Sequence, residues 1–233
     1  MKTSAQHMYQ RIVSVDYFSH LLTKQGEVIS LPADTLFIHA GEIIKYCYIV
    51  KQGMVTSLEI FPNGKIRQGI MIAENGIVGE EILFLGIPSP TAFITIMPTE
   101  LIRIKRDVLM SYLVENPSLY KSFIESLSKK VISGSYEISQ LLCHSVTWRL
   151  CNLLLIFQTH YGTVCDDGSI CIDIPLSQQK IARLLCVNRI TVVHIMKTLQ
   201  SIRLITRKKK KYYISDLDAL YAYMEQCDSS IVP

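Results

Sequence analysis

Two runs of apolar residues near the C-terminal end of the chain recur at helical spacing, with a short break between them. The first run, behind a Ser177 that can cap a helix, consists of Ile181, Leu184 and Leu185. Cys186-Val187-Asn188 supplies the break, and Asn188 suits the N-cap of a second helix. The second run places on one face Val192, Ile195, Met196 and Leu199. Residues 176–200 are therefore predicted to form two short helices joined by a tight turn.

The other face of the second predicted helix has a mixed character. It carries Arg189, Ile190, Val193, His194 and Lys197. Two short helices, the second with a mixed exposed face, make up the helix-turn-helix plan, in which the second helix enters the major groove of DNA. The pattern indicates a DNA reader.

Between residues 28 and 104 the apolar runs are shorter and are separated by turn residues. Asn63-Gly64, between two alternating runs, is the strongest hairpin signal. The regular spacing predicts an antiparallel barrel or jelly roll of roughly eight strands. Residues 1–27 are expected to form a polar lead with one short amphipathic helix near residues 17–22.

From Asn116-Pro117 onward the apolar period becomes helical. Alternating steps of three and four connect Ile124, Leu127, Val131, Gly134, Ile138, Leu141 and Ser145. This spacing is typical of a coiled-coil seam. Such a helix could lie on its own roll, but a dimer helix is favoured because helix-turn-helix proteins usually read two half-sites by two-fold symmetry. The predicted dimer contacts are Leu127, Val131, Ile138 and Leu141.

The remaining C-terminal segments complete a small domain. Residues 146–160 form an amphipathic helix whose expected core residues are Trp148, Leu150, Leu153, Leu154 and Phe157. Residues 161–174 are predicted to be a loop with a short strand, residues 205–214 a hairpin or wing, and residues 216–226 a closing helix. The predicted domains are 1–115, 116–145 and 146–233.

Charge changes this picture most in the C-terminal part. Residues 1–145 hold 13 Lys+Arg and 13 Asp+Glu, whereas residues 146–233 hold 11 and 7, so the net +4 lies in the second part. Residues 174–215 contain ten basic residues and no acidic one: Lys180, Arg183, Arg189, Lys197, Arg203, Arg207 and Lys208, Lys209, Lys210, Lys211. Such a one-signed surface neutralises phosphate, which supports double-stranded DNA as the partner.

Composition and candidate chemistry argue against an enzyme. The 49% hydrophobic and 19% charged content of the 233 residues is typical of an ordered globular protein. A metal-dependent roll needs several histidines, but residues 28–115 contain only His39, and neither a Ser-His-Asp nor a Cys-His set is identifiable. We expect no metal and no cofactor. A roll without such chemistry is better interpreted as a small-molecule sensor.

The cysteines and the N-terminal residues bear on the cellular compartment expected for the protein. Seven cysteines, an odd number without a CxxC pair, are expected to be mostly small buried hydrophobes, with a thiol switch as an open alternative. No apolar run approaches the length of a membrane span, and the first residues lack a signal-peptide core. A cytoplasmic protein is expected.

Taken in order, these pieces resemble the Crp/Fnr superfamily of bacterial transcription regulators, over nearly the whole chain. The resemblance rests on FIHAGEIIKYCYIVKQGMV at 37–55, on NGIVGEEILFLG at 75–86, and on IPLSQQKIARLLCVNRITVVHIMKTLQ at 174–200 followed by the wing. It implies an α+β fold with an N-terminal antiparallel β-roll of the cyclic-nucleotide-binding type, a long dimerisation helix and a C-terminal winged helix-turn-helix. It also implies a homodimer in which an effector in the roll repacks the dimer helix, with RNA polymerase as a further partner.

The resemblance assigns the effector site to Gly79, Glu80 and Thr91, but with one departure. Cyclic-nucleotide binders of the family follow the Gly-Glu pair with an Arg that pairs with the cyclic phosphate. Here the matching stretch is residues 88–92 (PSPTA), and no Lys or Arg occurs between Arg67 and Arg103. A buried phosphate without its cation would be costly, which disfavours a cyclic nucleotide.

Two branches of the family bear on the effector. The oxygen-sensing iron–sulfur branch uses an N-terminal cysteine cluster and is disfavoured, because the first cysteine is Cys47. TVVHIM in the recognition helix and the missing Arg are similar to the regulators of halorespiration genes, which bind chlorinated aromatic acids. An aromatic acid is therefore the expected class of effector.

The resemblance also assigns base-reading positions. Many members read bases with an Arg, a Glu directly after it and a second Arg, where this chain has Arg189, Ile190 and His194. Arg189 can contact guanine, whereas Ile190 can pack on a thymine methyl but cannot accept a hydrogen bond from cytosine. The expected DNA contacts are Ser177, Gln178, Lys180, Asn188, Arg189, Ile190, Thr191, Val193, His194, Lys197, Lys208, Lys209 and Lys210.

These observations favour a homodimeric transcription regulator whose affinity for a palindromic promoter site is controlled by a small molecule in the roll. Two alternatives remain open at this point. One is a regulator of the same fold that is controlled by cysteine oxidation. The other, of a different class, is a nucleotide-binding signalling module that acts on a protein partner.

Overall fold

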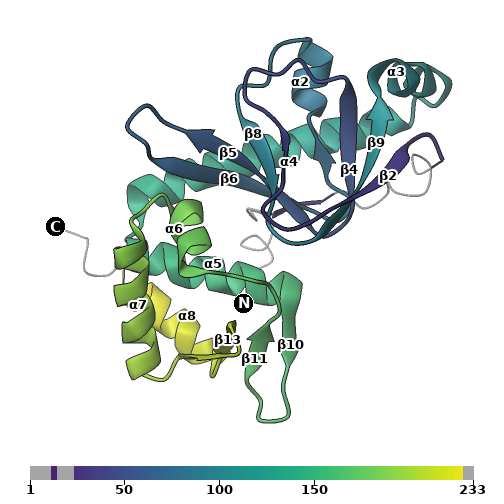
Figure 1. Ribbon diagram of the computed structural model, residues 1–233. Helices are drawn as coiled ribbons and strands as arrows, with labels where there is room; N and C mark the ends of the chain where they lie inside the picture. Colours follow the sequence, from purple (N-terminus) through teal and green to yellow (C-terminus); the bar gives the residue numbers. More distant parts are fainter. Residues whose placement is uncertain (1–11, 15–23, 228–233) are drawn as a thin grey trace. The chain divides into compact units, whose positions relative to one another are not determined.

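The computed structural model describes residues 12–14 and 24–227 (Figure 1). The short amphipathic helix expected near residues 17–22 lies outside these residues. The chain divides into two compact units, residues 1–64 with 69–136 and residues 65–68 with 137–233.

The first unit contains the roll, built from two sheets with the orders β1-β6-β5-β8-β3 and β2-β9-β4-β7. Its strands are β1 (Ile12–Val13), β2 (Glu27–Leu31), β3 (Leu36–Ile38), β4 (Tyr46–Gln52), β5 (Met54–Ile60), β6 (Ile66–Ala73), β7 (Ile77–Val78), β8 (Ala92–Thr95) and β9 (Thr99–Lys105). The eight strands from β2 to β9 confirm the predicted antiparallel roll. The added strand β1 runs parallel to β6, which the pattern did not predict.

The core of the roll lies between these sheets, because the strands alternate buried apolar side chains with more exposed ones. In β4, for example, Cys47 and Ile49 are buried while Tyr46 and Tyr48 are only partly covered. The hairpin predicted at Asn63-Gly64 is present. Its turn is closed by a hydrogen bond of 2.9 Å from Gly64 N to Phe61 O, with Gly64 at φ 75°.

Two helices of the first unit were missed by the sequence pattern. The helix α2 (Glu80–Leu85) has six residues, too few to show a helical period, and α3 (Arg106–Glu115) follows β9 without a break. The sequence pattern predicts only strands between residues 28 and 104. That prediction was wrong for residues 80–85, because one and a half turns of helix resemble a short apolar strand in sequence.

The long predicted helix is α4 (Leu119–Cys143), which ends before Ser145. Ser145 instead caps the next helix, α5 (Val146–Tyr161), by accepting a hydrogen bond of 3.1 Å from Trp148 N, so its place in the predicted seam was wrong. The apolar seam of α4 is largely at the surface. Val131 is 69% exposed and Ile138 is 58% exposed, while Leu127 is half-buried and Leu141 exposed.

The opposite stripe of α4 is polar and buried. Its members recur at steps of four and three: Ser126, Lys130, Ser133, Glu137 and Gln140. Four of the five are buried, and Lys130 is nearly so. A helix packed on its own domain would bury its apolar stripe and expose its polar one. In α4 the buried stripe is apolar only at the start, at Leu119 and Phe123, and from Ser126 onward the distribution is reversed.

The second unit contains α5 and a small sheet with the order β10-β11-β13-β12. Its other elements are β10 (Gly162–Val164), β11 (Ile170–Ile172), α6 (Gln178–Leu185), α7 (Arg189–Ser201), β12 (Ile205–Lys208), β13 (Lys211–Ile214) and α8 (Leu217–Gln226). The predicted core of α5 is confirmed, since all five of its residues are buried. Residues 161–174 form two paired strands rather than the one expected.

We expect Gly53→Ala to destabilise the first unit more than Gly41→Ala does. Both glycines have φ near the left-handed region, at 99° and 82°, which costs about 1 kcal/mol for alanine. A Cβ at Gly53 would also lie 2.6 Å from Pro98 O, whereas one at Gly41 would meet nothing within 4 Å. Thermal or urea unfolding should show a difference of about 2 kcal/mol between the variants. Equal losses would show that the turn after β4 relaxes freely.

Candidate functional site

The helix pair α6 and α7 begins at the N-cap residue Ser177 and is joined by a short turn from Cys186 to Asn188. Ser177 Oγ accepts a hydrogen bond of 3.1 Å from Lys180 N at the start of α6, as the sequence predicted. Cys186 ends α6 at φ 55°, and Asn188 occupies the N-cap of α7. The Asn188 side chain makes no capping hydrogen bond, so only its position was predicted correctly.

The helix α7 is held from one side and open on the other. Val192, Met196 and Leu199 are buried, which fixes the rotation of the helix. The side chains exposed on the opposite face are Arg189, Ile190, His194 and Lys197, and Thr191 and Val193 are partly covered. Ile190 is 69% exposed, which is a large exposed fraction for an apolar side chain. Ile195 is only half-buried, so its assignment to the core face was partly wrong.

The wing is the hairpin of β12 and β13, in which Lys208 pairs with Lys211. Its two-residue turn consists of Lys209 at φ 48° and Lys210 at φ 68°. Positive φ at both central residues defines a type I′ turn, a conformation that normally favours Asn-Gly. Lys208, Lys209 and Lys210 are exposed, whereas Lys211 forms an ion pair with Asp173. Cationic side chains therefore occupy a strained turn.

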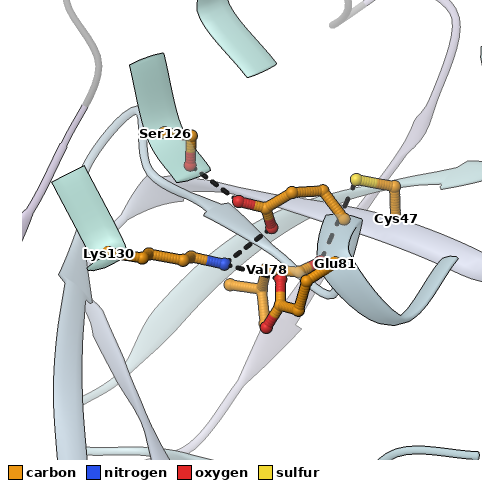
Figure 2. A network of polar contacts seen from close by, with 6 residues as sticks. Cys47, Val78, Glu81, Ser126 and Lys130 are labelled. Carbon is orange, nitrogen blue, oxygen red and sulfur yellow. Dashed lines mark hydrogen bonds and ion pairs between the residues drawn. The ribbon is translucent and has the colours of Figure 1, made fainter. Parts of the chain in front are cut away.

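The Gly-Glu motif of the roll lies at the start of α2. Gly79 is the N-cap at φ 85°, and the side chain of Glu80 is fully buried. Ser126 Oγ donates a hydrogen bond of 2.7 Å to Glu80 Oε1. Lys130 Nζ lies 2.7 Å from Glu80 Oε2 and 2.9 Å from Glu81 Oε2. Figure 2 shows Ser126 and Lys130 on α4 and Glu81 and Val78 opposite them.

Burial dominates the electrostatics of this cluster. Desolvation raises the pKa of Glu80 to about 7, against the opposing attraction of Lys130. Burial also acts on Glu81, but there the attraction of Lys130 prevails and lowers the pKa. Burial disfavours the charged Lys130, yet its two carboxylate partners raise its pKa. Burial raises the pKa of the neighbouring Cys47 thiol well above its usual value, so that group stays neutral.

Comparison with known proteins identifies both parts of the chain. Residues 28–116 match the family described as a cyclic nucleotide-binding domain, and residues 148–223 match the Crp-like helix-turn-helix domain. The chain belongs to the Crp/Fnr family. It is accordingly a transcription regulator of the Crp/Fnr type, with an effector-binding type of roll and a helix-turn-helix.

Three relatives illustrate the likeness to Crp/Fnr proteins. The chain is 26% identical over 182 residues to the global nitrogen regulator of Synechococcus elongatus, covering 77% of this chain and 82% of the relative. The structure of TTHA1359, a CRP/FNR family regulator from Thermus thermophilus, has a TM-score of 0.72 at 20% identity and covers 86% and 100% of the two chains. CprK complexed with OCPA has a TM-score of 0.66 at 18% identity, with 90% and 94% covered.

The structure brings only part of the expected effector site of this Crp/Fnr chain together. Gly79 and Glu80 adjoin each other, but among the described residues no hydrogen bond joins Thr91 to Glu80. The Thr91 carbonyl instead accepts a hydrogen bond of 2.5 Å from Ser89 Oγ. Ser89 in turn donates its backbone N–H to Glu42 O at 2.8 Å. Residues 88–92, where the phosphate-binding Arg is absent, are thus tied to a neighbouring loop.

Sequence reasoning missed Ser126 and Lys130 because it searched for a cation only between residues 67 and 103. Lys130 is 50 positions away from Glu80 along the chain. A signal for it was present: residues 126, 130, 133, 137 and 140 form a polar stripe at helical spacing. The sequence analysis interpreted only the apolar seam on the other side of the same helix as a contact surface.

The structure adds three observations on other features of the Crp/Fnr chain. Within residues 12–14 and 24–227, no three His, Cys, Asp or Glu side chains gather closely enough to hold a metal ion. No disulfide joins the seven cysteines, all of which lie among the described residues; Cys47, Cys151 and Cys171 are buried, and Cys143 and Cys186 are exposed. In the same residues, no helix combines the length and apolarity needed to cross a membrane.

We expect the double variant Lys209→Asn/Lys210→Gly to be more stable than the natural chain. Asn and Gly suit a type I′ turn, so relief of two left-handed lysines should contribute about 1–2 kcal/mol. The measurement is the melting temperature of the full chain, with Lys208→Gly as a control. Lys208 lies in a strand, where glycine should destabilise. A double variant that melts below the natural chain would show that the turn is not strained.

Proposed function

We propose that this protein is a homodimeric regulator that binds a palindromic promoter site under the control of a small-molecule effector. The observation that carries the proposal is α7, whose exposed Arg189, Ile190 and His194 stand on a helix anchored by buried Val192 and Met196. In this proposal, residues 1–115 bind the effector, residues 116–145 form the dimer contact and residues 146–233 bind DNA. It is not an enzyme.

The proposed DNA contacts fall into two classes. Arg189, Ile190, Thr191, Val193, His194 and Lys197 of α7 face the major groove, where Arg189 donates to guanine and Ile190 packs on a thymine methyl. Phosphate contacts come from the N-termini of the two helices and from the wing, through Ser177, Gln178, Lys180, Asn188, Lys208, Lys209 and Lys210. Half-sites richer in A·T than is usual for the family follow from Ile190.

The proposed dimer forms through α4. Its surface seam contains Val131 and Ile138, which the single chain leaves mostly exposed, with Leu127 and Leu141 on the same side. Apolar residues at alternating steps of three and four pack as knobs into holes when two such helices pair. A second copy of the chain would cover the seam by two-fold symmetry, and RNA polymerase is the further partner expected of a regulator.

The proposed effector is a small molecule other than a cyclic nucleotide. The residues 88–92 supply no cation for a phosphate, and Lys130 is already engaged by two carboxylates. A buried phosphate would have to compete with both of them. The structural neighbour CprK was solved in complex with OCPA, and we propose an aromatic acid for this chain as well.

Cysteine oxidation is retained as a second candidate for control, because Cys143 and Cys186 are exposed thiols. Under that alternative, reductant rather than a small molecule would change the affinity for DNA. If the protein were instead a nucleotide-binding signalling module, neutralising Arg189 and His194 would leave its function intact.

Site selection from fragmented genomic DNA by the reduced, ligand-free protein tests the proposed function. We expect enrichment of a two-fold palindrome, with no strict G·C pair opposite Ile190. The variant Ile190→Glu should acquire a preference of about 1–3 kcal/mol for G·C at that position, because a carboxylate accepts a hydrogen bond from cytosine. A natural site with a strict G·C pair opposite Ile190 would refute the proposed readout.

The same selection needs a control for non-specific charge effects. Lys105→Ala removes an exposed cation of the roll and should leave the selected sequence unchanged. If the ligand-free protein binds DNA without sequence preference, selection is repeated with aromatic acids added. Failure to select any sequence in either arm, or in oxidant, would overturn the proposal of a sequence-reading regulator.

We expect Val131→Glu to separate the dimer into monomers. A charge at the centre of the apolar seam would be buried without a partner on pairing, which costs several kcal/mol. Analytical ultracentrifugation should show the shift from dimer to monomer. Affinity for the palindrome should fall by at least about tenfold, because a subunit bound to one half-site no longer holds a second subunit near the other half-site. Ser128→Glu is the matched control, exposed on α4 outside the seam. A dimer that survives Val131→Glu would place the interface elsewhere.

A further inference from the structure

The contact between α2 and α4 contains more acid than base. Two carboxylates, Glu80 and Glu81, share one ammonium group, Lys130, within 2.7 and 2.9 Å. The side chain of Glu80 has no exposed surface and that of Lys130 is 12% exposed, whereas Glu81 reaches solvent at its edge. With all three groups ionised, this buried contact would carry one uncompensated negative charge.

Among the described residues, the groups around the contact do not supply the missing positive charge. Cys47 on β4 packs behind Glu80 and donates its thiol to Val78 O at 3.9 Å, so it is a neutral neighbour. Arg106 on α3 donates to Leu83 O at the other end of α2. Lys129, next to Lys130 on α4, pairs with Glu125 and with Ser14 O. Ser126 contributes a hydroxyl hydrogen bond and no charge.

One bound proton would neutralise the cluster. A protonated Glu80 retains both partners, since its carboxyl oxygens can still accept from Ser126 and remain beside Lys130, while Lys130 and Glu81 form a neutral pair. Loss of that proton leaves a buried carboxylate that is only half compensated, which is costly in the low dielectric of the interior. Separation of α4 from α2 would return Glu80 to water and remove that cost.

We propose that Glu80, Glu81 and Lys130 form a proton-dependent latch that holds α4 against α2 when one proton is bound and weakens when it is lost. The latch regulates the same helix that forms the proposed dimer, so its effect on DNA binding rests on the proposed function. Cellular pH and the effector would then act on one contact, because Glu80 belongs to the Gly-Glu motif of the roll.

The sign of the pH dependence follows from the pKa of Glu80. Burial raises it from 4.5 in water to about 7 in the closed latch. A raised pKa contributes stability that is fully present at low pH and is lost as the pH rises through the folded value. With these two pKa values, proton linkage lowers the equilibrium constant for closing the latch by about tenfold between pH 6 and pH 8.

Hydrogen exchange of the full chain tests the latch directly. We expect the protection of amides in residues 126–130, corrected for the intrinsic pH dependence of exchange, to fall by about tenfold between pH 6 and pH 8. Glu80→Gln mimics the protonated state and should make that protection independent of pH. Glu125→Gln is the matched control, because it removes a carboxylate from an exposed ion pair on the same helix. Unchanged pH dependence in Glu80→Gln would overturn the proposal.

A second measurement keeps the test valid if Glu80→Gln folds poorly. Carbon-13 NMR of glutamate carboxyl groups in the natural chain should show one group that titrates near pH 7. If all glutamates titrate in their ordinary range, the latch is refuted. DNA affinity measured over the same pH range separates the two proposals: a titrating latch with no sequence-specific DNA binding would leave the latch standing and refute the proposed function.

Discussion

The long helix α4 must satisfy two surfaces at once, and the rest of the structure depends on that constraint. From Ser126 onward its buried stripe is polar and its exposed stripe is apolar, the reverse of a helix that lies on its own domain, whereas Leu119 and Phe123 at its start are buried in the core of the roll. Phe123 of α4 packs edge-on against Phe84 of α2, with ring centroids 5.4 Å apart. The polar contacts beside this pair are more directional, so small chemical events can change that part of the attachment. In the proposed dimer, the exposed apolar stripe would supply a larger and less specific stabilisation by packing against the partner helix.

The latch gives the Gly-Glu motif of the Crp/Fnr roll a different setting from a free ligand site. Glu80 is committed to Ser126 and Lys130 inside the chain, so an effector has to compete with these groups or bind around them. Lys130 is shared with Glu81, so it compensates an ionised Glu80 only in part.

The sequence predicted what depends on local periodicity and missed what depends on contacts far along the chain. The helix pair, its Ser177 cap, the wing and the core of α5 were all readable, because burial imposes a period of 3.6 or 2 on the residues. The short helix α2 was not, since six residues show no period. Lys130 beside Glu80 was missed because residues 50 positions apart meet only through the fold. The DNA contacts and the effector site stay predictions.

The wing turn has a consequence for how ionic strength acts on this protein. Four consecutive lysines, Lys208 to Lys211, repel one another, and two of them also occupy a left-handed backbone conformation. Added salt screens this repulsion and so favours the folded hairpin, whereas the same screening weakens attraction to a polyanion. Salt therefore favours folding of the wing but weakens its binding to nucleic acid. A bound polyanion, by neutralising the lysines, would take the place of salt and stiffen the hairpin that holds it.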